Sequence, residues 1–234
     1  MREPGELLLD PARAAAALAA AELVEPGMTI GLGSGRAVFA IVELLARRWP
    51  GRPPVRVVVA SSATERLARE RGFELTGLDE DLTLDLALDG ADEVDRRLGL
   101  VKGGGGALLR EKLVLAAASR VVIVAERAKL VARLGQMYPL PVEVVRFAWP
   151  ATRRRVLELL PDATLRRQAT GAPVVTDEGH HLLDCRLPET DVAALAAALK
   201  ATLGVVEHGL FLDLADQALL GAPDGSVQVL HRGS

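Results

Sequence analysis

Cysteine, histidine and aromatic residues are scarce in this chain of 234 residues. The single cysteine excludes an internal disulfide framework and a zinc site built from several cysteines. Phe, Trp and Tyr together make up only 3% of the residues, so the core has to be aliphatic. Hydrophobic residues make up 50% of the chain, which excludes disorder along its whole length. The length suits one large domain, alone or with a smaller companion.

Positive charge is not in excess either, because the formal net charge is −3 at pH 7. A nucleic-acid-binding protein usually carries a basic footprint, so nucleic acid is not an expected partner. We interpret the two small basic clusters, 153–155 and 166–167, as a solvated helix face and a strand edge. Stretches without charge do not exceed about ten residues, which is too short for a membrane-spanning helix. These features predict a cytoplasmic protein with neither nucleic acid nor membrane as a partner.

Apolar strands alternate with helical stretches in the first half of the chain. The expected strands are 28–32, 55–60, 82–88 and 121–124, and the expected helices are 11–23, a segment after Arg36, 64–71 and 107–118. Asp10 and Pro11 are typical of an N-cap followed by the first helical position, so the alanine-rich run over 14–21 is not a signal peptide. The repetition of strand, loop and helix predicts an α/β fold with a doubly wound, mostly parallel, Rossmann-like sheet.

The pattern changes after Leu134. Residues 135–141 contain one glycine and two prolines, which favours a domain boundary. Beyond it we expect strands over 142–147, 174–176, 182–187 and 203–208, with helices over 151–160 and 191–199. Short strands mixed with two helices predict a smaller α+β domain of the ferredoxin-like type. We therefore predict a catalytic α/β domain formed by 1–134 and about 214–234, and a small domain over 135–213 that forms an oligomer interface.

Ligands bind to open α/β sheets at the carboxyl ends of the strands, where four segments of interest lie. The first, Gly31-Leu32-Gly33-Ser34-Gly35-Arg36, joins an expected strand to an expected helix. Arg36 stands where a dinucleotide-binding fingerprint requires its third glycine, which disfavours a nicotinamide cofactor. A phosphate-binding turn and a merely tight turn both stay open at this point. The second segment, Ser61-Ser62-Ala63-Thr64, is better explained as a helix cap than as a phosphate site.

The third segment, Asp89-Gly90-Ala91-Asp92-Glu93, places its first acid at the end of an apolar strand. Its carboxylates repel one another unless a cation compensates, although a solvated acidic turn is a common alternative. The fourth segment begins at Lys102, continues with four glycines and leads into a helix that contains Glu111 and Lys112. Consecutive glycines indicate close backbone approach or mobility. Together these residues suit proton transfer next to the carbonyl of a phosphorylated substrate.

At these residues the sequence resembles the ribose-5-phosphate isomerases of the A type. The resemblance extends from about residue 10 to about residue 228. The matching stretches are 31–35, 89–93, 101–112, 128–129, 139–144 and 204–211. The aspartate turn and the lysine–glycine–glutamate segment are specific in their order and spacing.

The resemblance implies the reversible conversion of ribose 5-phosphate to ribulose 5-phosphate through an enediol(ate), in the non-oxidative pentose phosphate pathway, without metal or organic cofactor. It implies that Glu111 moves a proton between C1 and C2, while Lys102 polarises the carbonyl and stabilises the enediolate. Asp89 would assist ring opening and the hydroxyl proton transfers, and Asp92 would bind substrate hydroxyls. The other implied substrate-binding residues are Ser34, Gly35, Arg36, Ala37, Gly90, Ala91, Gly103, Gly104, Gly105 and Lys129. The resemblance also implies a homodimer or a homotetramer.

The phosphate-side loop departs from the family's usual Gly-Thr-Gly-Ser-Thr, because Arg36 and Ala37 stand at its last two positions. Two side-chain hydroxyls are therefore missing, whereas the backbone N–H donors remain. The guanidinium group of Arg36 either binds the phosphate through charged, bidentate hydrogen bonds or points to solvent. Arg13, in the first expected helix, is a further candidate phosphate cation, where many relatives have lysine.

Other functions fit the sequence less well. A sugar-phosphate-sensing domain of a transcription regulator needs a DNA-binding segment, for which the roughly nine residues before the first expected helix leave no room. Sugar-phosphate deaminases and lactonases generally rely on a catalytic histidine, and the histidines here lie away from the four segments. A metal site at His180, His181, Asp184 and Cys185 fits no standard ligand spacing. Cys185 is better explained as a buried apolar residue in a strand.

Overall fold

A seven-stranded sheet forms the centre of the larger domain in the computed structural model, which describes residues 10–79 and 81–233. Its strands, in the order in which they pair, are β14 (Val227–His231), β13 (Gln217–Gly221), β7 (Val121–Glu126), β4 (Leu86–Asp89), β1 (Thr29–Leu32), β2 (Arg56–Val59) and β3 (Glu74–Leu75). All neighbours are parallel except β13 and β14. This arrangement confirms the predicted doubly wound, mostly parallel sheet.

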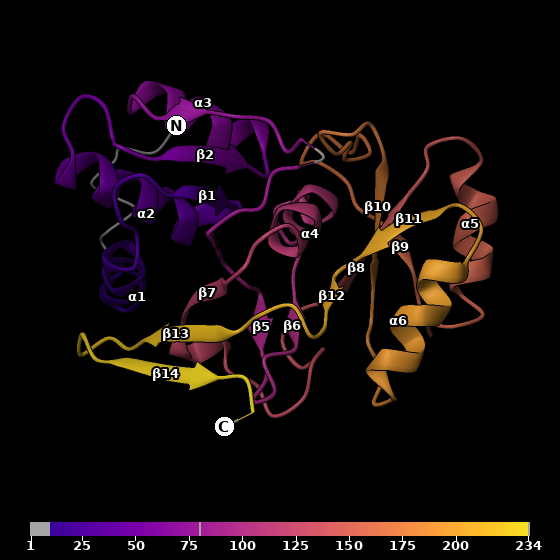
Figure 1. Ribbon diagram of the computed structural model, residues 1–234. Helices are drawn as coiled ribbons and strands as arrows, with labels where there is room; N and C mark the ends of the chain where they lie inside the picture. The colour runs from indigo at the N-terminus through magenta and orange to yellow at the C-terminus, as the bar shows by residue number, and fades with distance from the viewer. Residues whose placement is uncertain (1–9, 80, 234) are drawn as a thin grey trace.

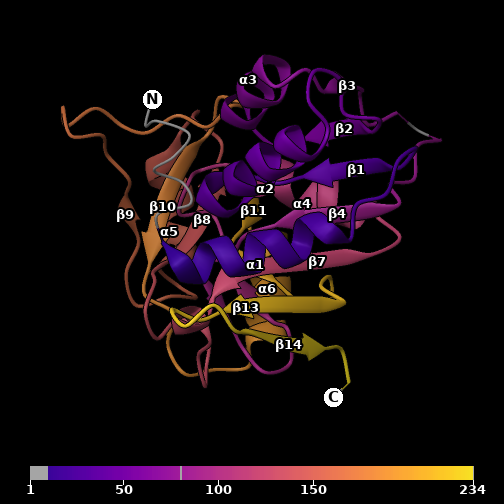
Figure 2. The same ribbon diagram turned by 90° about the vertical axis from the view of Figure 1, so that its left-hand side faces the viewer.

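Helices cover both faces of this sheet (Figure 2). One face carries α1 (Pro11–Glu22), α2 (Gly35–Arg48) and α3 (Ser62–Glu70), and the other face carries α4 (Leu108–Ala116). The side chain of Asp10 caps α1 by accepting a hydrogen bond of 3.1 Å from the backbone N–H of Arg13, as the sequence predicts. Gly221 allows β13 to approach the backbone of α1 closely, because a Cβ atom at this position would lie 1.8 Å from the carbonyl oxygen of Ala12.

The C-terminal segment returns to the large sheet after the chain has formed the smaller domain (Figure 1). Strand β13 pairs in parallel with β7, and β14 follows it as an antiparallel edge strand. A separate three-stranded sheet consists of β12 (Leu210–Phe211), β6 (Leu100–Val101) and β5 (Glu93–Val94). These short strands are not evident in the sequence, and β6 delivers Lys102 to the edge of the large sheet.

The smaller domain has the ferredoxin-like order β-α-β-β-α-β. Its elements along the chain are β8 (Leu140–Val144), α5 (Trp149–Val156), β9 (Thr164–Leu165), β10 (His181–Cys185), α6 (Val192–Ala201) and β11 (Val205–His208). They form an antiparallel sheet in the order β11-β8-β10-β9. Cys185 is buried in its aliphatic core, as predicted. The first nine residues of the predicted catalytic domain, Glu80 and Ser234 lie outside the described residues.

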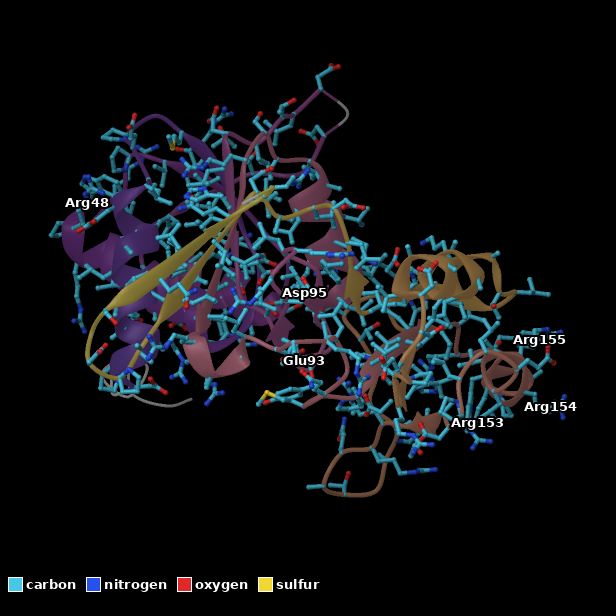
Figure 3. The ribbon with its side chains drawn as sticks, turned by 90° about the horizontal axis from the view of Figure 1, so that it is seen from below. Arg48, Glu93, Asp95, Arg153, Arg154 and Arg155 are labelled. Atoms are coloured by element: carbon cyan, nitrogen blue, oxygen red, sulfur yellow. The ribbon has the colours of Figure 1, made fainter. Side chains whose placement is uncertain are left out.

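Two local predictions for this domain are wrong. Residues 174–176 form a loop instead of a strand, because their polar groups bind elsewhere: Thr176 donates its hydroxyl to Glu143 at 2.8 Å. Arg154 and Arg155 lie exposed at the outer edge of α5, as expected (Figure 3). Arg166, however, is not solvated, because its side chain is only 16% exposed and forms an ion pair with Asp184.

Within the part of the chain that the structure describes, no helix has the length and apolar character needed to cross a membrane.

Candidate active site

A cavity of about 320 Å³ opens at the carboxyl ends of β1, β4 and β7. Every sequence-predicted site residue except Asp89 lines it, and Asp89 is fully buried beside Lys102. Arg13, Glu126 and Tyr138 line it as well. The complete lining is Arg13, Ser34, Gly35, Arg36, Ala37, Gly90, Ala91, Asp92, Lys102, Gly103, Gly104, Gly105, Glu111, Glu126, Lys129 and Tyr138. The predicted residues come from four separate segments of the chain, 34–37, 89–92, 102–111 and 129, which the structure brings together.

The ammonium group of Lys102 lies at the centre of this arrangement. Its Nζ atom is 2.9 Å from Oδ2 of Asp89 and 3.4 Å from Oε2 of Glu111, and it donates a hydrogen bond of 2.7 Å to the carbonyl of Gly90. Burial by itself lowers the pKa of Lys102, but the attraction of both carboxylates outweighs burial and raises it. Lys102 is therefore a fixed positive charge in a nearly water-free position.

Asp89, the last residue of β4, is completely buried. Its Oδ1 atom accepts hydrogen bonds from the backbone N–H groups of Ser34 at 3.2 Å and Gly90 at 2.7 Å. Burial, together with the nearby charge of Glu111, raises the pKa of Asp89 to about 7 in spite of the opposing effect of Lys102. The carboxyl group can therefore exchange a proton near neutral pH.

Close packing explains the glycine that precedes Ser34. A Cβ atom on Gly33 would lie 1.9 Å from Cγ of Asp89, so any side chain at this position would displace the carboxyl group. Residue 33 has to be glycine for the end of β4 to fit against the end of β1.

Glu111, in the first turn of α4, is also buried. The hydroxyl of Ser34 donates a hydrogen bond of 2.5 Å to its Oε1 atom. Its Oε2 atom has no hydrogen-bond partner among the described residues, although Lys102 lies nearby. One oxygen is thus held in place, and the other remains available to accept a proton from a molecule in the cavity.

The glycine segment approaches the acidic turn through its backbone. The N–H of Gly104 donates a hydrogen bond of 2.8 Å to Oδ2 of Asp92. A Cβ atom on Gly104 would lie 2.8 Å from Oδ1 of the same carboxylate, and Gly103 adopts φ +105°. Glycine permits both the close approach and the backbone conformation, so this stretch is an ordered wall of the cavity rather than a linker.

Cations gather at the end of the cavity formed by α1 and the turn after β7. Arg13 donates hydrogen bonds of 2.9 and 2.7 Å to Oε1 of Glu126, and Lys129 lies 3.1 Å from Oε2. Burial raises the pKa of Glu126, but Lys129 and Arg13 outweigh that effect and lower it to about 2. Arg36 is exposed at the start of α2 and faces the same cavity. This end of the cavity suits an anion, because the N-terminus of α2 adds its own partial positive charge.

The third acid of the acidic turn has a role that the sequence does not reveal. Glu93 is fully buried and accepts hydrogen bonds from the backbone N–H groups of Gly135, Met137 and Tyr138. It thereby fixes the segment between the two domains and brings Tyr138 to the cavity. These three backbone partners lie more than forty positions away from Glu93 and leave no local pattern, so the sequence does not predict the contacts.

Two polar groups outside the cavity are explained by the structure. Ser61 caps α3 by accepting a hydrogen bond of 3.1 Å from the N–H of Thr64, which confirms the preferred interpretation of that segment. The side chain of His180 faces Glu143 at 3.0 Å, and Asp184 binds Arg166. Among the described residues, no group of three or more His, Cys, Asp and Glu side chains is arranged to hold a metal ion.

Comparison with known proteins gives a consistent result. The sequence profile of the family described as ribose 5-phosphate isomerase A (phosphoriboisomerase A) matches residues 56–225. A protein named ribose-5-phosphate isomerase A from Roseiflexus sp. (strain RS-1) is 52% identical over 214 residues, covering 90% of this chain and 91% of the relative. The protein of the same name from Synechococcus sp. (strain JA-3-3Ab) is 48% identical over 219 residues, covering 92% of this chain and 95% of the relative.

Solved structures agree with the sequence comparisons. The ribose 5-phosphate isomerase of Plasmodium falciparum superposes with a TM-score of 0.89 at 33% identity, covering 95% of this chain and 98% of that one. A D-ribose-5-phosphate isomerase in complex with phospho-erythronic acid superposes with a TM-score of 0.88 at 32% identity, covering 99% and 100%. In sequence and fold, this chain belongs to the ribose 5-phosphate isomerase A family.

Proposed function

We propose that this protein interconverts ribose 5-phosphate and ribulose 5-phosphate through an enediolate, as an aldose–ketose isomerase of the non-oxidative pentose phosphate pathway. The observation that carries the proposal is the buried triad of Glu111, Lys102 and Asp89 around one cavity. A base, a fixed positive charge and a second acid with a pKa near neutrality are what a proton shift between two neighbouring carbons requires.

Glu111 is the base in this proposal. Its Oε2 atom removes the proton from C2 of the open-chain aldose, and the electron pair of that bond forms the C1–C2 double bond. The carbonyl oxygen on C1 takes up the resulting negative charge, which the ammonium group of Lys102 stabilises. Glu111 then returns the proton to C1, while the hydroxyl proton on C2 passes to the oxygen on C1. C2 thereby becomes the ketone, and C1 carries the new hydroxyl. Ser34 holds the carboxylate in one orientation during both transfers.

Asp89 moves the hydroxyl protons in this proposal. Ribose 5-phosphate is mostly a closed ring, so the anomeric hydroxyl has to lose a proton before the ring opens. A carboxyl group with a pKa of about 7 can accept that proton and deliver it to the ring oxygen as the bond between C1 and that oxygen breaks. Asp92 and the backbone of Gly103, Gly104 and Gly105 bind the sugar hydroxyls, and the hydrogen bond from Gly104 to Asp92 supports this assignment.

The phosphate group binds at the opposite end of the cavity. The N–H of Ser34 is donated to Asp89, so the backbone of Gly35, Arg36 and Ala37, at the start of α2, supplies the N–H donors. Lys129 and Arg13 supply positive charge. Arg36 compensates for the hydroxyl groups that the family's usual sequence has at this loop. The phospho-erythronic acid bound by a solved relative has a phosphate at one end and a planar carboxylate at the other, so it resembles the proposed enediolate in shape and charge.

A coupled assay for ribulose 5-phosphate formation tests the proposed function, run with and without EDTA. We expect turnover of ribose 5-phosphate that chelation leaves unchanged, because the proposed steps use carboxylates and a lysine. The same assay on the Glu111→Gln variant provides the background rate. A folded wild-type protein that gives no more product than this variant would contradict the proposal.

We also propose that the protein is a homo-oligomer assembled through the small domain with a second copy of itself, as a homodimer or homotetramer. Phe147 is 89% exposed and Leu203 is 75% exposed. Their loops are joined by a hydrogen bond of 3.0 Å from the N–H of Val145 to the carbonyl of Gly204, so both side chains belong to one end of that domain. Light scattering on Phe147→Glu should show a smaller mass than the wild type, whereas Leu18→Glu on α1 serves as the control.

A further inference from the structure

The glycine segment of the active site is in contact with one side chain of the small domain. Arg166 follows β9, and its Nη1 atom donates hydrogen bonds to the carbonyl of Gly103 at 2.8 Å and to the carbonyl of Gly104 at 3.1 Å. None of the proposed catalytic side chains belongs to the small domain. The contact therefore links that domain to the catalytic backbone.

The guanidinium group is itself fixed from behind. Its Nε and Nη2 atoms donate to the two oxygens of Asp184, on β10, at 2.9 and 2.5 Å. The backbone of Arg166 is held in the small domain's sheet by hydrogen bonds to Leu182 at 2.8 Å and from Val174 at 2.9 Å. A bidentate ion pair of this kind fixes the plane of the guanidinium group, so Nη1 can point in only one direction.

The orientation of a carbonyl determines the orientation of the next N–H, because a peptide unit is planar and its two polar groups point in opposite directions. The peptide between Gly103 and Gly104 is held on both sides: Arg166 binds its carbonyl and Asp92 binds its N–H at 2.8 Å. Arg166 also binds the carbonyl of Gly104, which directs the N–H of Gly105 away from the guanidinium group. Consecutive glycines have no side chains that would restrict these peptides otherwise.

We propose that Arg166 and Asp184 are positioning residues for the isomerase reaction: they hold the Gly103–Gly105 backbone, and through it Asp92, in a fixed geometry toward the substrate. This inference rests on the proposed function, since the importance of the glycine segment comes from its place in the substrate cavity. The small domain thus contributes to catalysis through the backbone of the glycine segment.

The test compares Arg166→Ala with Arg167→Ala. Arg167 is the adjacent residue, is exposed and binds only the carbonyl of Gly171 among the described residues, so its loss serves as the matched control. We expect kcat to fall about 10²-fold in Arg166→Ala, the usual cost of misplacing reacting groups by about 1 Å. We expect the melting temperature to change little and Arg167→Ala to behave as wild type. Millimolar guanidinium chloride, far below denaturing concentrations, should restore part of the activity of Arg166→Ala only.

A second variant and a spectroscopic readout separate positioning from general stabilisation. Asp184→Asn should also lower kcat. The kcat of the double variant should be no lower than that of Arg166→Ala, because both substitutions disrupt the same ion pair. In protein labelled with ¹⁵N-glycine, the amide signals of Gly104 and Gly105 should shift or broaden in Arg166→Ala and remain unchanged in Arg167→Ala. This measurement does not need substrate, so it judges the positioning role even if the proposed reaction were wrong.

Two results would overturn the inference. Wild-type kcat and unchanged glycine amides in a folded Arg166→Ala would show that the contact positions nothing. A loss of activity that follows the unfolded fraction, with no rescue by guanidinium and no shift of these amides in the folded protein, would assign Arg166 a structural role only.

Discussion

The hydroxyl of Ser34 lies 2.5 Å from Oε1 of Glu111, whereas Oε2 of the same carboxylate has no hydrogen-bond partner among the described residues. The bond joins the loop after β1 to the first turn of α4, two segments that are 77 positions apart. It restrains the rotation of the carboxylate and leaves its second oxygen directed toward Lys102 and the cavity. The proposed base is therefore oriented before substrate arrives.

Replacement of this base should abolish most of the activity. Glu111→Gln keeps the shape of the side chain and an oxygen that Ser34 can bind, but it cannot accept a proton. We expect kcat to fall by about 10²–10⁴-fold, the usual contribution of general acid–base catalysis, with KM close to wild type. Steady-state kinetics of ribose 5-phosphate turnover measure this. Near-normal kcat in Glu111→Gln would assign the proton transfer to another group.

Loss of the Lys102 ammonium group should lower the rate of the chemical step rather than the affinity for the substrate. Lys102→Ala removes the charge that stabilises the developing oxyanion, so we expect kcat to fall by about 10²–10³-fold. The same assay separates this effect from ground-state binding, because a change confined to KM would make Lys102 a uniform binding group instead.

The raised pKa of Asp89 predicts a pH dependence. Asp89 has to be ionised to accept the anomeric proton, and its pKa is about 7. The logarithm of kcat/KM should therefore rise with pH by about one unit per pH unit below 7 and level off above it. Asp89→Asn should lower the plateau and remove this limb of the profile. A wild-type profile that stays flat between pH 5.5 and 8 would contradict the assigned role.

Arg36 offers a test of phosphate binding. We expect Arg36→Ala to raise KM several-fold and to weaken competitive inhibition by inorganic phosphate, with kcat unchanged, because the guanidinium group faces the cavity at the start of α2. Arg47→Ala, at the opposite end of the same helix, is the matched control. Equal KM values for the two variants would show that Arg36 points to solvent.

Lys112, the neighbour of the proposed base, should matter for stability instead of catalysis. Its Nζ atom donates to Glu207 at 2.7 Å and to the carbonyls of His208 at 2.9 Å and Leu210 at 3.0 Å. Lys112→Met leaves these acceptors without their donor, so we expect a loss of about 3 kcal/mol in the free energy of unfolding. Denaturant unfolding measures this loss, and kcat of the folded fraction should not change. Unaltered stability would show that water replaces the ammonium group.

The sequence predicts much of this molecule because its signals are local. The apolar run over 121–124 and the helical spacing after Arg36 correspond to β7 and α2. The strand predicted over 174–176 is wrong because its polar groups bind to Glu143 and His181, which lie on other elements. Hydrophobic pattern alone does not reveal such partners.

Long-range polar contacts are what the sequence leaves out. The sequence predicts that Arg166 is part of a solvated basic pair, yet its side chain donates hydrogen bonds to the carbonyls of Gly103 and Gly104, which lie 63 and 62 positions earlier in the chain. In the sequence Glu93 is one of three acids in the same turn, but in the structure its carboxylate lies outside the cavity lining and accepts a hydrogen bond from the backbone N–H of Tyr138. The family resemblance, which rests on local motifs, implies the cavity residues, whereas the groups that hold them in place depend on tertiary packing.

The place of β13 in the large sheet has a consequence for biosynthesis. During translation, β7 is made long before β13, which pairs with it from Gln217 to Gly221. Until the last part of the chain leaves the ribosome, β7 has an unpaired edge and α1 lacks the strand that covers it. The ferredoxin-like domain is complete by then, so the nascent protein finishes its inserted domain first and its catalytic domain last.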